Sequence, residues 1–487
     1  MKFIRVIALF MSAVALLSMF SACASSVEAE IDTSVTEAET EEEAMPSVEK
    51  NNYNDEFYLS ILDDVNPPDY YWVEESEGDA LSEAIYARQE KVMNYLGVSV
   101  ISKMAGDYNN YIEPFKNTVI NKDGSVDTLL SHVNQGVAGL ISGIYLRSFD
   151  NLPGVDIEAD HWNHEFMDTL SIAGKYYLGF SDFNILYTHV IAFDKKMLEK
   201  LSLDGYSEIE LYDSVRNYEW TIDRLLELAT LGYQEKSSGN IYGLTGQQWV
   251  PWIGFLHAAD INLVEIAEDG TYQISIMNEK NKEKTADLTE KLKEFVRSKK
   301  GQFTTPDGNS VPSPDARLTN GRALMSLTST YGLVDLLDYE ISFGVLPYPM
   351  YDENQKDVGY RSLQWGGYLC VPSYLRNEDM TGETLEVLSF YSDKVKVTFY
   401  EKLLGKQVAE APDDRQMLDL IWDGVCADFG QTFADEAAGL LYLFPNVTDP
   451  HKPYELVSYH ASVMGSGNRN INAFVRKVEK ASNRLNH

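Results

Sequence analysis

Short apolar runs alternate with amphipathic segments along most of the chain. The runs at 57–63, 98–104 and 137–142 have the length of buried strands, and 80–96 has the pattern of a helix that ends at Gly97. A strand-helix-strand order predicts parallel strands joined by right-handed crossovers. We therefore expect an α/β fold, with ligands beyond the carboxyl ends of the strands.

Aromatic side chains follow two of the predicted strands. Tyr71 and Trp72 lie in the loop after the first strand, and Trp249 and Trp252 follow a strand predicted at 242–244. Both groups belong to the edge of the sheet where ligands are expected. Capping of the sheet edge explains Tyr71 and Trp72 equally well.

Further helix signals occur from the middle of the chain onward. Residues 217–233 predict a helix with Thr221 as its N-cap, because apolar residues then repeat at helical spacing. Two more helices are predicted at 384–400 and 471–485, and a linker at 302–315.

The stretch from Gly344 to Ser373 combines two strands with a turn and a glycine pair. Pro347 ends the first strand, and Gly366 and Gly367 stand between Trp365 and Tyr368. Adjacent glycines allow a close approach of the backbone, and the aromatic rings offer flat faces. A strand that enters the core through a glycine kink is the alternative.

Four motifs occur in a fixed order around this stretch. They are NGRALMSL at 320–327, the strand at 344–349, the Trp-Gly-Gly segment at 360–372 and TGETLEVLSFYS at 381–392. This order resembles the extracellular solute-binding proteins of the sugar-transport type, family 1. The resemblance covers about 53–475.

The resemblance implies a two-lobed, periplasmic-binding-protein-like fold of type II. Its lobes would be joined by a hinge of three crossovers near 182–188, 326–331 and 362–368. Lobe 1 would contain 53–185 plus 329–363, and lobe 2 would contain 186–328 plus 364–487.

The resemblance also implies a sugar site between the lobes. Asp182 would accept sugar hydroxyls there, although a turn aspartate that caps local backbone is the alternative. The expected contact residues are Tyr71, Trp72, Asp182, Asn184, Trp249, Trp252, Tyr331, Arg361, Trp365 and Tyr368.

The N-terminus has the pattern of a secretion signal. Lys2 and Arg5 precede an apolar core at 6–20, and small residues lead to Cys23. We expect a signal peptide at 1–22 and a lipidated Cys23 that anchors the protein to a membrane. Phe20 stands where lipoprotein signals usually carry Leu, Val or Ile, so secretion without a lipid is the alternative.

The segment 23–52 predicts a disordered acidic tether. From residue 24 onward it carries nine carboxylates against Lys50 and has no aromatic residue, so it cannot bury enough surface to fold.

Charge and aromatic content restrict the classes of ligand that the protein is expected to bind. The 487 residues carry a formal charge of −35, which disfavours a nucleic-acid partner because that role needs a basic face. The chain contains 30 Tyr and 7 Trp. Such an aromatic share suits a groove whose flat walls contact the apolar faces of sugars.

Catalytic and metal motifs are largely missing from the sequence. It contains no G-x-S-x-G, P-loop, H-E-x-x-H or C-x-x-C motif, and we expect no cofactor. His161 and His164 are spaced as helical metal ligands, but we interpret the pair as structural and expect no metal. Cys370 and Cys426 form either a disulfide or two buried thiols.

Three functions remain open. The first is an extracellular binding protein, a monomer and not an enzyme, that delivers an oligosaccharide or other sugar to the permease subunits of an ABC importer. The second is a secreted carbohydrate-active enzyme that uses an unrecognised carboxylate pair. The third is a surface protein that binds or senses glycans without transport.

Overall fold

A computed structural model describes residues 45–62, 66–76, 78–107, 109–247, 249–304, 314–406 and 408–485. The chain divides into two units, Met1–Met45 and Pro46–His487, and all helices and strands below belong to the second. The predicted signal peptide and Cys23 lie outside the described residues.

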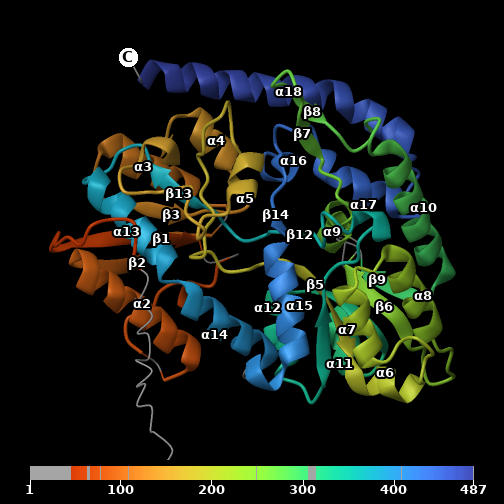
Figure 1. Ribbon diagram of the computed structural model, residues 1–487. Coiled ribbons are helices and arrows are strands. Elements are labelled where there is room, and N and C mark those ends of the chain that lie inside the picture. The colour runs from red at the N-terminus through yellow and green to blue at the C-terminus, as the bar shows by residue number, and fades with distance from the viewer. Residues whose placement is uncertain are drawn as a thin grey trace, which may run out of the picture. The chain divides into compact units, whose positions relative to one another are not determined.

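The first of two five-stranded sheets has the strand order β2-β1-β3-β13-β4 (Figure 1). Strand β1 is parallel to β2 and β3, whereas β13 is antiparallel to β3 and β4. The bounds are β1 Asp55–Leu62, β2 Val98–Gly106, β3 Thr128–Leu130, β4 Leu146–Arg147 and β13 Leu369–Pro372. The predicted parallel start of this sheet is confirmed.

One predicted strand is a helix. Residues Val137–Ser142 form α4, and the third strand is β3 at Thr128–Leu130 instead. The buried residues Val137, Ala138, Leu140 and Ile141 share one face of this helix. A short apolar run does not distinguish a buried strand from a buried helix, which is why the prediction was wrong here.

The second sheet has the order β11-β5-β10-β6-β9. Strand β5 is antiparallel to both β10 and β11, and β6 is parallel to β10 and β9. The bounds are β5 His189–Asp194, β6 Tyr242–Gln247, β9 Gly301–Thr304, β10 Ala323–Ser329 and β11 Phe343–Leu346. Two small pairs join β12 Ser362–Leu363 to β14 Val425–Cys426 and β7 Val264–Ile266 to β8 Tyr272–Ile274.

The sheets correct two strand assignments in the predicted lobes. Strand β11 lies within 329–363, which we assigned to lobe 1, yet it pairs with β5 in the second sheet. Strand β13 lies within 364–487, assigned to lobe 2, yet it pairs with β3 in the first sheet. The chain therefore stays with the second sheet after 326–331, because the helix α12, Thr330–Leu336, leads from β10 to β11 and both strands belong to that sheet.

The helix α2, Ala80–Leu96, has both of its predicted ends. Asp79 accepts hydrogen bonds from the backbone of Leu81 and Ser82, and Gly97 adopts a left-handed conformation with φ 65°. The helix predicted at 217–233 is α8, Ile222–Gly232, and the side chain of Thr221 caps it. The other α-helices before residue 378 are α3 Ile112–Asn121, α5 His164–Thr169, α6 Lys195–Leu201, α7 Glu208–Arg216, α9 Val250–Ala258, α10 Lys282–Ser298, α11 Pro314–Thr319 and α12 Thr330–Leu336.

The helix predicted at 384–400 is two helices, α13 Glu378–Phe390 and α14 Asp393–Leu404. The break is held at Ser392, whose hydroxyl donates to the Leu388 carbonyl at 2.7 Å and accepts from Arg88 at 3.0 Å. The last predicted helix, 471–485, is the end of a longer one, α18 Leu456–Leu485. The remaining helices are α15 Pro412–Asp423, α16 Phe429–Thr432 and α17 Leu443–Thr448, with 3-10 turns at Pro68–Tyr70, Phe149–Asn151, Glu353–Gln355, Val408–Glu410 and Leu440–Tyr442.

Two segments predicted as irregular are partly ordered. The linker 302–315 begins inside β9 and ends inside α11, and 305–313 lie outside the described residues. The last part of the predicted tether packs on the fold: Tyr95 donates to the Val48 carbonyl at 2.8 Å, and the Asn51 amide donates to the Tyr95 carbonyl at 3.1 Å. The second bond satisfies a backbone carbonyl in the last turn of α2 that the helix itself cannot pair.

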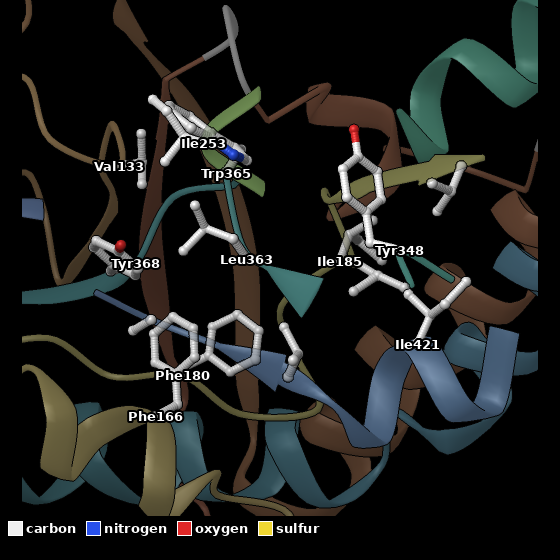
Figure 2. Packing of buried hydrophobic residues seen from close by; sticks show 14 of the residues in the cluster. Val133, Phe166, Phe180, Ile185, Ile253, Tyr348, Leu363, Trp365, Tyr368 and Ile421 are labelled. Atoms are coloured by element: carbon white, nitrogen blue, oxygen red, sulfur yellow. The ribbon is translucent and has the colours of Figure 1, made fainter. Parts of the chain in front are cut away.

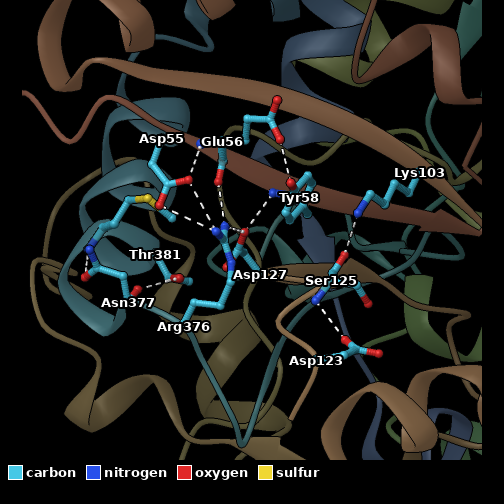
Figure 3. A network of polar contacts seen from close by, with 11 residues as sticks. Asp55, Glu56, Tyr58, Lys103, Asp123, Ser125, Asp127, Arg376, Asn377 and Thr381 are labelled. Atoms are coloured by element: carbon cyan, nitrogen blue, oxygen red, sulfur yellow. Dashed lines mark hydrogen bonds and ion pairs between the residues drawn. The ribbon is translucent and has the colours of Figure 1, made fainter. Parts of the chain in front are cut away.

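A network of charged side chains around the buried Asp127 links the end of the return strand β13 to β1 (Figure 3). Arg376, just after β13, donates to the Glu56 carbonyl at 2.7 Å and to Asp127 at 3.1 Å. Asp127 also accepts from the Tyr58 amide at 2.8 Å. Burial raises the pKa of Asp127, and the nearby guanidinium opposes that rise. The network thus fixes the place where the chain re-enters the first sheet.

Candidate ligand-binding site

A pocket of about 620 Å³ lies where both sheets and the segments between them meet. Its walls include the loop after β3, the end of β6, and the two segments that contain Tyr187 and Trp365. The lining residues are His132, Val133, Asn134, Gln135, Tyr187, His189, Gln247, Trp249, Trp365, Ala434, Asp435, Gly439, Leu441 and Tyr442. The pocket is therefore at the carboxyl ends of strands in both sheets, as ligand sites of α/β folds are.

The two connecting segments are bound to each other. The Trp365 amide donates to the Tyr187 carbonyl at 2.7 Å. Gln364 accepts from the Tyr187 amide at 3.1 Å and donates to the Ile185 carbonyl at 3.1 Å. This pairing places the side chains of Tyr187 and Trp365 beside the same pocket.

Aromatic rings form much of the pocket wall. Trp249 stacks on Tyr442 with ring centroids 4.6 Å apart. Gly439 adopts φ 80°, a left-handed conformation that starts the 3-10 turn carrying Tyr442. Trp365 contacts His189 edge to face, with centroids 5.9 Å apart.

Trp365 is largely enclosed by apolar side chains, with 9% of its surface exposed. Figure 2 shows it in the buried cluster with Val133, Ile253 and Leu363. Trp365 thus has a packing role as well as a place in the pocket wall.

The glycine pair after Trp365 has a structural cause. A Cβ on Gly367 would lie 1.8 Å from the Ser131 carbonyl oxygen, and the Gly367 amide donates to Asn66 at 3.0 Å. The sequence indicated a close approach of the backbone at Gly367. In the structure, this backbone lies against the loop after β3.

The polar groups of the pocket carry little charge. Among the described lining residues Asp435 is the one carboxylate, and there is no lysine or arginine. Asn134, Gln135 and Gln247 contribute amides. The ring of His132 accepts from the backbone of Asn134 and Gln135 at 3.2 and 3.1 Å, which shapes their loop.

Of the ten predicted contact residues, Trp249 and Trp365 line the pocket together. Tyr331 lies behind it, stacked on Tyr187 with centroids 4.2 Å apart.

Four of the predicted residues are buried in the interior, at most 1% exposed, and offer no surface to a ligand in this conformation. Asn184 donates to the Gly367 carbonyl at 3.1 Å, and Tyr368 shares a hydrogen bond with Thr432 at 2.8 Å. Tyr71 accepts from the Ile185 amide, and Trp252 packs on Phe303 with centroids 4.7 Å apart.

Trp72 and Arg361 have protein partners outside the pocket lining. Trp72 donates its ring N–H to the Val100 carbonyl at 2.7 Å. Arg361 forms an ion pair with Glu165. For Trp72 the position agrees with the alternative of capping the sheet edge.

Asp182 lines a second pocket of about 320 Å³ that shares no lining residue with the first. Asp160, Trp422 and Asp423 also line it. Burial raises the pKa of Asp182 to about 6, and Lys396 opposes that rise. A role for Asp182 in the aromatic pocket is thus not supported by this arrangement.

In the described part of the chain, no group of three or more His, Cys, Asp or Glu side chains is placed to hold a metal ion. His161 contacts Glu386 at 2.9 Å instead. Cys370 and Cys426 are both free and buried, so of the two alternatives the structure contains the thiols.

Sequence reasoning missed four parts of the pocket: the loop 132–135, Tyr187, His189, and the segment 434–442. The loop follows β3, so the carboxyl-end rule finds it once that strand is placed at Thr128–Leu130. His189 and the 434–442 segment carry no motif that identifies them.

Similarity to known proteins lies in the fold. No family model and no curated protein sequence matches the chain. Among solved structures, an ABC substrate-binding protein from Listeria monocytogenes in complex with cycloalternan is 14% identical, with a TM-score of 0.52 over 88% of this chain and 99% of that chain. A cyclic α-maltosyl-1,6-maltose binding protein from Arthrobacter globiformis is 12% identical, with a TM-score of 0.54 over 86% and 98%.

A third structure, UgpB from Mycobacterium tuberculosis in complex with glycerophosphocholine, is 13% identical, with a TM-score of 0.50 over 89% of this chain and 99% of that chain. Each alignment covers at least 86% of this chain and nearly the whole length of the neighbour. The chain has the two-sheet α/β fold of the periplasmic-binding-protein-like type.

Proposed function

We propose that this protein is an extracellular solute-binding protein that binds a carbohydrate, an oligosaccharide, in the aromatic pocket. The observation that carries the proposal is the composition of that pocket, whose walls come from both sheets and from the segments between them. Trp249, Tyr442 and Trp365 offer aromatic surface, and amide side chains lie among them. Sugars combine apolar ring faces with hydroxyl edges, and such a wall suits both.

The structural neighbours support the same class of ligand. The Listeria monocytogenes and Arthrobacter globiformis proteins bind cyclic oligosaccharides. At 14% and 12% identity the structural similarity itself shows the fold, so the residues of the pocket carry the argument for the ligand class.

We propose that binding closes a hinge. A ligand that touches Asn134 after β3 and Gln247 at the end of β6 contacts both sheets at once. A conformation that completes both sets of contacts gains the binding free energy, so the ligand shifts the population toward it. An ABC permease would receive the sugar from this closed state, with the protein acting as a monomer.

The described lining of the pocket does not contain the carboxyl pair of a glycosidase. Glycoside hydrolysis generally needs two carboxyl groups about 5–10 Å apart across the bond. Asp435 is the one carboxylate among the described residues of the lining. We therefore propose binding without cleavage.

We also propose that lipidated Cys23 holds the protein on the outer face of a membrane. In the described part of the chain, no helix is both long and apolar enough to cross a bilayer. Replacing Cys23 by Ser and fractionating the cells tests the anchor. Release of the variant into the medium is expected, and a wild-type protein already found in the medium contradicts it.

A thermal-shift screen against a panel of oligosaccharides, followed by calorimetric titration, tests the binding function. We expect at least one sugar to raise the melting temperature and to remain uncleaved after incubation. Cleavage of a bound sugar would support the carbohydrate-active enzyme instead. No shift with any sugar would reject the proposed function.

A further inference from the structure

Two polar side chains meet in the aromatic pocket without hydrogen-bond partners. The Nδ1 atom of His189 and the Nε1 atom of Trp365 are both buried, and neither has a partner among the described residues. The two rings lie edge to face, with an interplanar angle of 84°. Both residues line the pocket.

Their backbones are fixed, so the side chains cannot easily turn elsewhere for partners. His189 begins β5, where it pairs with Ser329 of β10. Trp365 is held by the bond from its amide to the Tyr187 carbonyl. Buried polar groups are nearly always paired, and each unpaired group destabilises the folded state. A molecule in the pocket that supplies the missing partners would remove this cost.

The other tryptophans show how unusual this is. The ring N–H of Trp72, Trp162 and Trp220 each donates to a protein oxygen, at 2.7, 2.9 and 2.9 Å. Trp252 also lacks a partner, but it is fully buried and does not line the pocket. Among the described lining residues, Trp365 is thus the tryptophan whose ring N–H is buried without a protein partner.

The chemistry of the pair specifies the ligand group. Burial lowers the pKa of His189 to about 3, so the imidazole is neutral and has one donor and one acceptor nitrogen. The indole N–H is a donor. A hydroxyl group can accept from one ring and donate to the other.

Binding of a negatively charged ligand group in this pocket would be unfavourable. The described lining has no lysine or arginine, and its one charged side chain, Asp435, is negative. A phosphate or carboxylate would lose its hydration without gaining a cation, which is costly.

We propose that His189 and Trp365 form a neutral hydrogen-bonding pair that selects a hydroxyl-bearing, uncharged sugar and rejects sugars that carry phosphate or carboxylate. The selection rests on the proposed function, since it concerns the ligand of the same pocket. His189 is thereby assigned as a specificity-determining residue.

Calorimetric titration of the full chain tests the charge selection without any variant. The neutral probes are maltotriose, mannotriose and raffinose, and the anionic probes are trigalacturonate and maltotriose phosphorylated on one primary hydroxyl. We expect at least one neutral probe to bind, and the anionic probes to bind at least about tenfold more weakly. Equal or tighter binding of an anionic probe overturns the proposal.

Substitutions of His189 test its part in binding. His189→Phe keeps a flat ring and removes both nitrogens, and it should weaken binding of the neutral probe about tenfold. His189→Asn restores a donor and an acceptor, so it should bind more tightly than His189→Phe. His164→Phe, in the second pocket, is the matched control and should leave the affinity unchanged.

The outcomes distinguish a failure of the His189 assignment from a failure of the proposed function. If neutral sugars bind but His189→Phe retains wild-type affinity, the His189 assignment fails and the proposed function stands. If no probe binds the wild-type chain, the proposed function and the selection fail together.

Discussion

The ring of Tyr187 stacks on the ring of Tyr331, with centroids 4.2 Å apart and an interplanar angle of 11°. Tyr187 belongs to the segment that leads into β5, and Tyr331 to the start of α12 after β10. The same junction is closed by the Thr330 hydroxyl, which donates to the Leu186 carbonyl at 2.8 Å. Tyr331 therefore supports, from behind, a residue that lines the pocket.

Removing that support should weaken ligand binding. In Tyr331→Ala the ring of Tyr187 loses its stacking partner, and such aromatic pairs contribute about 0.5–1.5 kcal/mol beyond their buried area. We expect an affinity for the bound sugar roughly 2- to 10-fold lower, measured by calorimetric titration.

Tyr218→Ala is the matched control for that experiment. Tyr218 stacks on Tyr360 with an interplanar angle of 8°, and neither ring lines the pocket. Its loss should change the melting temperature but not the affinity. An equal effect of both variants on affinity would mean that Tyr331 acts through general stability.

Variants of Trp365 and Trp252 should distinguish an effect on sugar binding from an effect on core packing. Trp365→Phe and Trp252→Phe both shorten a buried ring, so both should lower the free energy of unfolding by about 1–3 kcal/mol. Only Trp365 lines the pocket, so only its variant should lose sugar affinity, by tenfold or more. Chemical denaturation and titration on the same samples measure the two effects. Unchanged affinity in Trp365→Phe would remove this residue from the site.

Asp182 should make stability depend on pH in a defined direction. Its pKa is raised from 3.8 to about 6, so between those values the folded protein holds a proton that the unfolded chain has released. The contribution of Asp182 to the free energy of unfolding is therefore fully present below about pH 4 and is lost as the pH rises through 6.

Asp182→Asn should therefore be more stable than the wild type at pH 7, by about 2 kcal/mol, with the difference vanishing near pH 4. Denaturant unfolding at several pH values measures this difference. Asp423→Asn, an exposed residue of the same pocket, should change stability by less than about 0.5 kcal/mol. A less stable Asp182→Asn at pH 7 would show that attraction to Lys396 outweighs the cost of burial.

The buried thiols should react only after unfolding. Burial raises the pKa of Cys370 to about 12 and that of Cys426 to about 11, so neither is a thiolate at neutral pH. With Cys23 replaced by Ser, iodoacetamide should modify no thiol in the native protein and two in denaturant, by intact mass. Reductant should leave the melting temperature unchanged. Modification that requires prior reduction would indicate a disulfide.

The sequence by itself determined the local elements that carry their own signals. Helix α2 could be placed between Asp79 and Gly97 because an N-cap and a left-handed glycine are local features. Gly344, Val345 and Leu346 before Pro347 likewise predicted a strand, which is β11 at Phe343–Leu346. The fold class followed from the order of such elements and from the resemblance of four short motifs.

Only the tertiary structure decided which segments share a sheet and a pocket. Val137–Ser142 forms a helix, although its apolar run fits a buried strand equally well. Strand β11 belongs to the second sheet because strand pairing is set by partners distant in the chain. The same holds for the site. Trp249 and Trp252 are close in sequence, yet one lines the pocket and the other is buried in the core. His189 has no local motif, and its place beside Trp365 exists because two connecting segments are hydrogen-bonded where the sheets meet.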